Sequence, residues 1–179
     1  SRILRVIKEV PAKSPAMLYS QARRICWCDL FDAQHGFLVE SLGADAGDGG
    51  MAPKQVITQV RESIRDVFDR ELGRVPAVDL VEPRVVVVAH LAHGRCMLSL
   101  DTSGKSLHKR GYRESGHPAP LKETLAAAIL ILAGYDGTQP FMDPMCGSGT
   151  LAIEAAMMAV RKAPRIHRKK GGFYFEWLN

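Results

Sequence analysis

The segment from residue 141 to residue 156 constrains the fold of this chain more than any other part of the sequence. Apolar residues lead to Asp143, Gly147 and Gly149 follow, and a run of helix-forming residues begins at Thr150. This order predicts a short strand that ends at Asp143, a glycine turn and a helix. Glycine permits positive φ and removes side chains that would keep a ligand from the main chain. The free N–H groups at a helix start favour an electron-rich ligand group, so the segment is typical of a nucleotide-type binding site.

Three ligands suit such a turn. A phosphate loop needs a lysine directly before the Ser or Thr, whereas a glycine precedes Thr150, which disfavours an ATPase or a GTPase. Residues 147–152 fit the relaxed G-x-G-x-x-A dinucleotide pattern, but no acid lies between Glu154 and Glu176, where a ribose-binding acid about twenty positions on is expected. S-adenosylmethionine has no pyrophosphate and tolerates a shorter turn, with an acid such as Asp143 near the cofactor. An ordinary helix-opening turn remains the alternative.

The composition indicates a globular protein outside the membrane. The 179 residues, 46% of them hydrophobic, suffice for one large or two small packed domains. No apolar run approaches the roughly eighteen residues that span a bilayer, and the basic start at residues 1–8 lacks a signal-peptide apolar region. We therefore expect a soluble, cytoplasmic protein.

The cysteines and histidines give no metal signature. The sequence has no C-x-x-C pair and no histidine at zinc-finger spacing, so we predict neither a disulfide framework nor a metal site. His90 and His93 follow a strand-like run and would lie on opposite faces of a strand. We expect buried free thiols at all four cysteines, Cys26, Cys28, Cys96 and Cys146.

Positive charge is concentrated in two clusters, although the formal net charge is only +5. Residues 161–170 contain six Lys or Arg and no acid, and residues 105–113 contain four and no acid, whereas residues 29–82 are rich in acids. Such clusters indicate an anionic partner. Solvated surface segments are the alternative reading of charge alone.

Hydrophobic periodicity in the N-terminal part predicts alternating strands and helices. The helix at 53–72 is the clearest, because apolar residues recur every three or four positions with charged residues opposite them. Strands and helices in this order predict an α+β domain with helices packed on a sheet. The expected elements are a strand at 1–10, a helix from Ser14-Pro15, a strand at 36–42, a loop at 43–50, the helix at 53–72, and strands at 84–91 and 95–101 joined by a hairpin at His93-Gly94.

The C-terminal part predicts a second, incomplete domain. Polar residues 102–117 have the composition of a linker, so we place the boundary near Arg113, with domains at 1–113 and 114–179. Residues 121–133 predict a helix that is buried on several sides, because they lack a wide polar face. A second helix is expected at 150–160 and a strand at 173–177.

Three long motifs, in this order, resemble a known family. They are the runs Leu98 to Arg113, Ala119 to Ala128, and Asp143 to Thr150 followed by Ile153 to Ala156. Together they are similar to the THUMP-domain RNA guanine-N2 methyltransferases. The resemblance covers nearly the whole chain. It implies an α+β THUMP and ferredoxin-like RNA-binding domain, followed by the truncated start of an α/β Rossmann-like S-adenosylmethionine methyltransferase domain.

The resemblance also implies the roles of particular residues. Those expected at the cofactor S-adenosyl-L-methionine are Asp143, Pro144, Met145, Cys146, Gly147, Ser148, Gly149 and Thr150, together with Pro120, Leu121 and Lys122. Those expected to contact RNA, in and around the family's basic RGYR segment, are Lys105, His108, Lys109, Arg110, Tyr112 and Arg113. The activity implied for the full-length protein is guanine-N2 methylation of 23S ribosomal RNA.

Departures from the family pattern limit what these residues are expected to do alone. Ala163-Pro164-Arg165 stands where the family has Ala-Pro-Gly, which bears on one turn only. The family's catalytic Asn/Asp-Pro-Pro-Tyr/Phe tetrapeptide does not occur, so we predict no catalytic residue within this sequence. Together with the missing initiator methionine, this predicts an inactive fragment. A non-catalytic RNA-binding adaptor and, more distantly, an NAD-dependent oxidoreductase remain alternatives, and the sequence carries no signal for the oligomeric state.

Overall fold

The computed structural model describes residues 2–43, 51–104, 106–113 and 120–162. They belong to two compact units, one formed by Arg2–Gly104 and the other beginning at Lys105. The placing of the domain border near Arg113 remains a prediction. The expected loop at 44–50, Lys105, the basic run from residue 163, the altered Ala-Pro turn and the expected strand at 173–177 lie outside the described residues.

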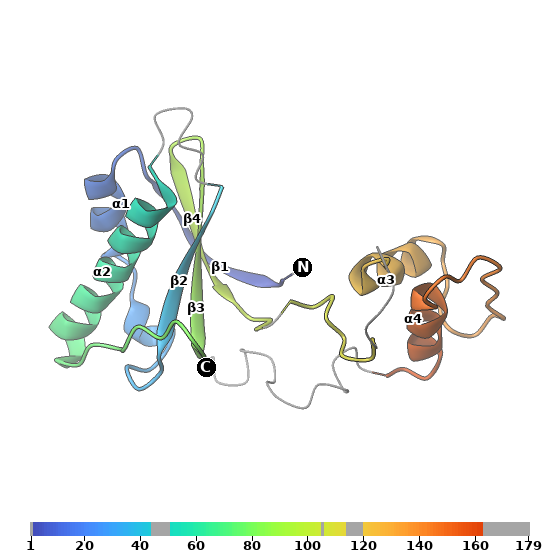
Figure 1. Ribbon diagram of the computed structural model, residues 1–179. Helices are drawn as coiled ribbons and strands as arrows, with labels where there is room; N and C mark the ends of the chain where they lie inside the picture. The colour runs from blue at the N-terminus through green and yellow to red at the C-terminus, as the bar shows by residue number, and fades with distance from the viewer. Residues whose placement is uncertain (1, 44–50, 105, 114–119, 163–179) are drawn as a thin grey trace. The chain divides into compact units, whose positions relative to one another are not determined.

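A four-stranded mixed sheet forms the frame of the first unit (Figure 1). The strands are β1 (Leu4–Pro11), β2 (Phe37–Leu42), β3 (Val85–Ala92) and β4 (Arg95–Asp101), in the spatial order β1-β4-β3-β2. β4 pairs antiparallel with β1 and β3, whereas β2 and β3 are parallel. The hairpin between β3 and β4 turns at His93 and Gly94, both with positive φ, which confirms the predicted hairpin and the four predicted strands.

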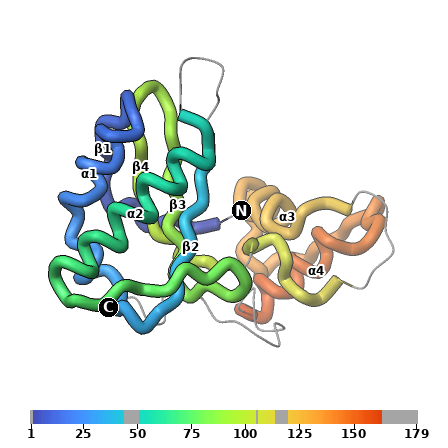
Figure 2. The backbone as a smooth tube through the Cα atoms, turned by 60° about the vertical axis from the view of Figure 1, so that its left-hand side comes forward, coloured from blue at the N-terminus to red at the C-terminus, as the bar shows by residue number. Residues whose placement is uncertain are grey.

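Two helices, α1 (Pro15–Ala22) and α2 (Pro53–Leu72), cover one face of this sheet (Figures 1 and 2). The Ser14 hydroxyl accepts a hydrogen bond from the Met17 N–H at 3.2 Å and so caps α1, as its sequence predicts. α2 ends at Gly73, whose φ of 60° stops the helix in a left-handed conformation. A short 3-10 helix, η1 (Trp27–Asp29), lies in the connection between α1 and β2.

The core of the first unit lies between α2 and the sheet. The apolar stripe of α2 is buried as far as Phe68, with Val56, Val60, Ile64 and Phe68 each 0% exposed, whereas Leu72 at the end of the helix is 53% exposed. The ring centroids of Phe31 and Phe68 lie 5.0 Å apart. Burial of each such side chain stabilises the fold by about 1.5–3 kcal/mol. The predicted amphipathic helix is therefore confirmed, together with its inward face.

The second unit contains the two helices α3 (Glu123–Leu132) and α4 (Thr150–Ala159), which pack on each other. The prediction that α3 is buried on several sides was wrong, because Ile131 is 62% and Leu132 is 87% exposed. Within the described residues of this unit, α4 is the one helix against which α3 can bury an apolar side, so Ala126 and Leu130 are its only enclosed apolar side chains.

The strand expected to end at Asp143 is also absent, since residues 141–143 have no regular structure. A strand forms when its N–H and C=O groups pair with a neighbouring strand, and the described part of the second unit contains none. The chain instead runs from α3 to α4 through turns at residues 133–149.

The expectation of four buried thiols is confirmed for Cys96 alone and was wrong for Cys26 and Cys146. Cys26 and Cys146 are exposed, Cys28 is half-buried and Cys96 is buried. Cys26 lies in the turn before η1 and Cys146 in the glycine turn, where neighbouring side chains are too few to cover a thiol. None of the helices in the described ranges combines the length and apolar character that crossing a bilayer requires.

Candidate cofactor-binding turn

Residues 143–149 form an open turn that leads into α4. The Asp143 Oδ1 atom accepts a hydrogen bond from the Met145 N–H at 3.1 Å, and the Gly149 N–H donates to the Cys146 carbonyl at 2.7 Å. Gly147 and Gly149 have φ values of 51° and 72°, a conformation that glycine adopts without strain. The predicted glycine turn is thus present, although no strand precedes it.

The turn exposes bare main chain. Apart from its chain neighbours, no atom lies within 4 Å of the position that a Cβ would take at Gly147, and at Gly149 the nearest is the Ile153 Cδ1 at 3.9 Å. Met145 is 89% exposed. No side chain caps the start of α4, so the positive end of the helix faces outward. A ligand with an electron-rich group can therefore approach the backbone here.

The second predicted cofactor segment, Pro120 to Lys122, leads directly into α3, with Lys122 as the N-cap residue of the helix. Pro120 and Lys122 are exposed, whereas the Leu121 carbonyl accepts a hydrogen bond from Arg113 Nη2 at 2.8 Å. The same Arg113 nitrogen lies 3.3 Å from the Thr150 hydroxyl. Arg113 therefore connects the two segments that the sequence assigns to the cofactor.

Arg110 is buried and paired with an acid. Its side chain is 8% exposed, its Nε and Nη2 atoms each lie 3.4 Å from an oxygen of Glu154, and its Nη1 donates to the Leu107 carbonyl at 3.1 Å. Turning the guanidinium towards a phosphate would leave the buried Glu154 carboxylate without its cation. The RNA contact at Arg110 stays a prediction, and this geometry disfavours it.

Tyr112 faces the same carboxylate. Its hydroxyl donates a hydrogen bond to Glu154 Oε1 at 2.9 Å. Burial and this bond to a negatively charged acceptor raise the pKa of Tyr112. The phenol therefore stays protonated and keeps donating at neutral pH. Its hydroxyl is engaged inside the unit, which leaves its half-buried ring as the part that RNA could contact.

The other predicted RNA residues differ in exposure. Lys109 is exposed and His108 is half-buried. Burial lowers the pKa of His108, and its Nδ1 atom has no hydrogen-bond partner among the described residues. At neutral pH the imidazole is uncharged, so it contributes no charge to phosphate binding.

Two acids in this unit were missed as functional candidates. Glu154, on α4, is 3% exposed and holds Arg110 and Tyr112, and Glu123, at the start of α3, is 6% exposed and lies 3.4 Å from Arg113 Nε. The signal for Glu154 was available in the sequence, because it is the one acid in an otherwise apolar helix. Acids are almost never buried without a partner.

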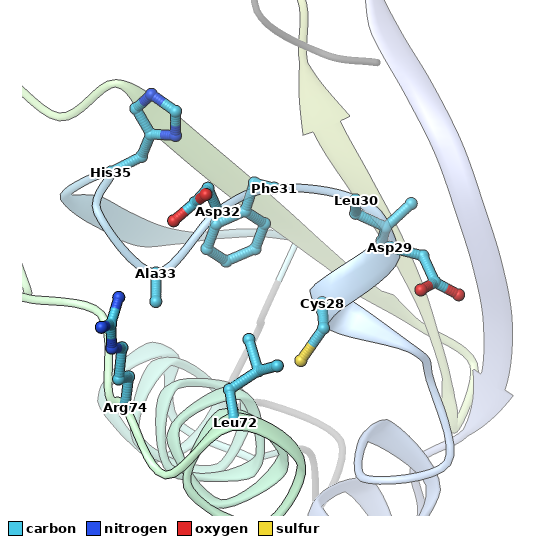
Figure 3. A pocket seen from close by; sticks show the side chains of 9 residues that line it. All are labelled: Cys28, Asp29, Leu30, Phe31, Asp32, Ala33, His35, Leu72 and Arg74. Atoms are coloured by element: carbon cyan, nitrogen blue, oxygen red, sulfur yellow. The ribbon is translucent and has the colours of Figure 1, made fainter.

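The first unit contains a pocket that the sequence did not predict (Figure 3). It has a volume of about 690 Å³ and lies between η1, the loop that follows it and the end of α2. Both signs of charge occur in its lining, and burial raises the pKa of the Cys28 thiol, which disfavours a reactive thiolate. The lining residues are Cys28, Asp29, Leu30, Phe31, Asp32, Ala33, His35, Leu72 and Arg74. In the described part of the chain, no group of three His, Cys, Asp or Glu side chains is arranged to hold a metal ion.

Two family models match this chain and define its class of protein. A THUMP domain matches residues 12–101, and an RMKL-like methyltransferase domain matches residues 110–178. The THUMP match spans half of the chain, so the chain belongs to the THUMP-domain family, with RMKL-like methyltransferase sequence after it.

Curated relatives are similar over nearly the whole chain. The ribosomal RNA large subunit methyltransferase K/L of Vibrio campbellii is 39% identical over 178 residues, which cover 97% of this chain and 24% of the relative. The protein of the same name from Pseudomonas paraeruginosa is 40% identical over 182 residues, covering 99% of this chain and 25% of the relative. The chain therefore spans about a quarter of the length of these relatives.

Solved structures share the fold. SMU.472, described as a candidate methyltransferase and solved in complex with SAH, has a TM-score of 0.81 and 30% identity, covering 99% of this chain and 46% of that one. A protein from Listeria monocytogenes, assigned by prediction as an N6-adenine-specific DNA methylase, has a TM-score of 0.79 and 29% identity, covering 99% of this chain and 45% of that one. The methyltransferase fold class expected from the sequence is thereby confirmed.

Proposed function

We propose that this chain is part of an S-adenosylmethionine-dependent enzyme that methylates guanine N2 of large-subunit (23S) ribosomal RNA in the cytoplasm. The observation that carries the proposal is the open glycine turn at 143–149. It stands directly before a helix start, in a chain that is 39% identical to a K/L ribosomal RNA methyltransferase. The THUMP unit supplies RNA binding, and the turn supplies part of the cofactor site.

The proposed cofactor contacts are made by main chain and small side chains. Asp143 to Thr150 offers backbone that no side chain covers at Gly147, and Pro120 to Lys122 provides a second segment. The cofactor supplies an already activated methyl group on its sulfonium, so the residues of this chain have to bind and orient it. The complex of SMU.472 with SAH supports this choice of cofactor.

The choice of ribosomal RNA as the substrate rests on the names of the relatives rather than on the turn. The fold alone does not select the substrate, because a protein assigned as an adenine DNA methylase shares it at 29% identity. Relatives at 39% and 40% identity carry the name of large-subunit ribosomal RNA enzymes, which favours RNA. Methylation of a base inside a helix requires that the base be flipped out of the stack.

A second candidate function is a non-catalytic RNA-binding role for residues 1–179. Residues 1–179 contain no Asn/Asp-Pro-Pro-Tyr/Phe tetrapeptide, but the relatives' names favour the enzyme over this role. Incubation of the chain with radiolabelled S-adenosylmethionine and 23S ribosomal RNA should then give RNA binding without methyl incorporation. Methylation by residues 1–179 would exclude the adaptor role and show that the tetrapeptide is dispensable.

Cofactor binding is tested by isothermal titration of the chain with S-adenosylhomocysteine and, separately, with NAD. We expect heat with S-adenosylhomocysteine only. The variant Gly147→Val should lose at least about tenfold in affinity, because a β-branched residue is strained at positive φ and covers the backbone.

Gly134→Val is the matched control for this experiment. Gly134 also has positive φ, of 75°, and no atom within 4 Å of a built Cβ, but it lies at the end of α3 rather than in the turn. It should bind S-adenosylhomocysteine as the unmodified chain does. Equal affinities of Gly147→Val and the unmodified chain, or binding of NAD alone, would refute the proposed cofactor site.

A further inference from the structure

Residues 110–113, here called the strap, contact both segments assigned to the cofactor. Arg110 and Tyr112 bind the carboxylate of Glu154, and Arg113 binds the Leu121 carbonyl and the Thr150 hydroxyl. We propose that the strap is a positioning element that holds the glycine turn and the start of α3 in the geometry that binds the cofactor. The inference rests on the proposed function, and it replaces an RNA-binding role for Arg110 and Arg113.

The geometry of α4 explains how two contacts of the strap fix the orientation of its first turn. Thr150 and Glu154 are four residues apart in the helix and therefore lie on one face, a single turn from each other. Arg113 contacts the first of them and Arg110 the second. The strap thus runs along the first turn of α4, and it fixes the direction in which the glycine turn presents its N–H groups.

The contacts of Arg113 extend the strap to α3. Its Nη2 lies 2.8 Å from the Leu121 carbonyl, and its Nε lies 3.4 Å from Glu123 Oε1, a carboxylate in the first helical turn. One guanidinium therefore joins the approach to α3 with the first residue of α4. A planar, forked donor suits this task, whereas the single ammonium of a lysine cannot reach two directions at fixed angles.

The low exposure of the strap arginines and of the acids they pair with argues against a role in phosphate binding. The side chains of Arg110, Arg113, Glu123 and Glu154 are 8%, 28%, 7% and 4% exposed. Ions taken out of water stay in place when they are paired and hydrogen-bonded. The two arginines are paired with the two acids within the unit, so their charge is already compensated before any nucleic acid arrives.

The first experiment compares affinity for S-adenosylhomocysteine, by isothermal titration, among strap variants of the whole chain. Tyr112→Phe removes only the hydroxyl, and Arg113→Lys keeps the charge but loses the fork. Each should weaken binding by about threefold to tenfold, since each removes one hydrogen bond to or from a charged group. Lys162→Ala is the control, because it removes an exposed positive charge at the end of α4, away from the turn. It should bind unchanged.

The second experiment needs no ligand. Hydrogen exchange should be faster in the strap variants at the Gly149 and Ile153 amides, which bond to the Cys146 and Gly149 carbonyls in the unmodified chain. Amides of α2, in the other unit, should exchange at the unmodified rate. Circular dichroism confirms that each variant retains its helices.

The outcomes separate the inference from the proposed function. If the unmodified chain binds S-adenosylhomocysteine and the strap variants match Lys162→Ala in both affinity and exchange, the inference is wrong and the proposed function stands. If the unmodified chain does not bind S-adenosylhomocysteine, the proposed function fails and the cofactor role of the strap fails with it. Weaker binding with faster exchange in the strap variants alone supports the inference.

Discussion

Different kinds of interaction stabilise each of the two units internally. The first packs two helices on a four-stranded sheet around side chains such as Phe68 and Ile64, which are fully buried. In its described residues, the second has two helices with exposed apolar side chains, a buried ion pair at Arg110 and a partly exposed one at Arg113. Apolar burial is non-directional and accumulates with area, whereas each buried ion pair depends on one partner at one angle. The first unit should therefore tolerate conservative changes that the second does not.

The strongest test of this difference is Phe68→Ala in α2. The side chain is 0% exposed and contacts the Phe31 ring, so its removal should destabilise the first unit by about 3–5 kcal/mol. Urea unfolding, followed by the fluorescence of the buried Trp27, measures this loss. Lys54→Ala, at an exposed position of the same helix, is the control. A loss below about 1 kcal/mol would mean that the core does not hold this unit together.

Glu154→Gln tests the polar interactions of the second unit. Gln keeps the size of the side chain and removes its charge, which leaves the buried Arg110 without a carboxylate. The distances of 3.4 Å are long for ion pairs, so we expect a loss of about 2–3 kcal/mol. Hydrogen exchange should show opening of α4 with α2 unaffected. Exchange in α4 equal to that of the unmodified chain would show that the ion pair contributes nothing.

Thiol reactivity contrasts the two units in one measurement. Burial raises the pKa of Cys96 to about 11, whereas Cys146 is exposed in the glycine turn. The thiolate is the reactive form, and it becomes about tenfold scarcer for each unit by which pH lies below the pKa. At pH 8, iodoacetamide should therefore modify Cys146 at least about a hundredfold faster than Cys96.

Peptide mass spectrometry measures these two rates. Raising the pH towards 11 should narrow the difference, because Cys96 then begins to ionise. In about 8 M urea the chain unfolds, so burial of Cys96 is lost and the two rates should converge. Similar rates at pH 8 in the folded chain would contradict the burial of Cys96.

The smallest expected effect concerns RNA affinity. Lys109 is exposed, so Lys109→Ala should lower the salt dependence of binding to 23S ribosomal RNA by about one counterion. Arg110→Gln, which removes the charge, should leave that dependence unchanged, because the cation at position 110 is directed towards Glu154. Fluorescence anisotropy at several salt concentrations measures both slopes. A slope for Arg110→Gln as flat as that for Lys109→Ala would restore Arg110 as a phosphate contact.

Much of the fold could be predicted from the sequence because its signals are local. The cap of α1 at Ser14, the stripe of α2 and the hairpin at His93-Gly94 all depend on residues a few positions apart. The glycine turn was predicted for the same reason. The strand at Asp143 was not correctly predicted, because a strand depends on a neighbour that local sequence does not specify.

The sequence by itself determined the helices and strands of the first unit, and a turn near Gly147 that lets a ligand reach the backbone. Only the tertiary structure decided that Arg110 faces Glu154, 44 residues away. It also decided that Cys96 is covered while Cys146 is not. Backbone preference is set by a residue and its neighbours along the chain, whereas burial and charge pairing are set by whichever distant residues the fold brings into contact.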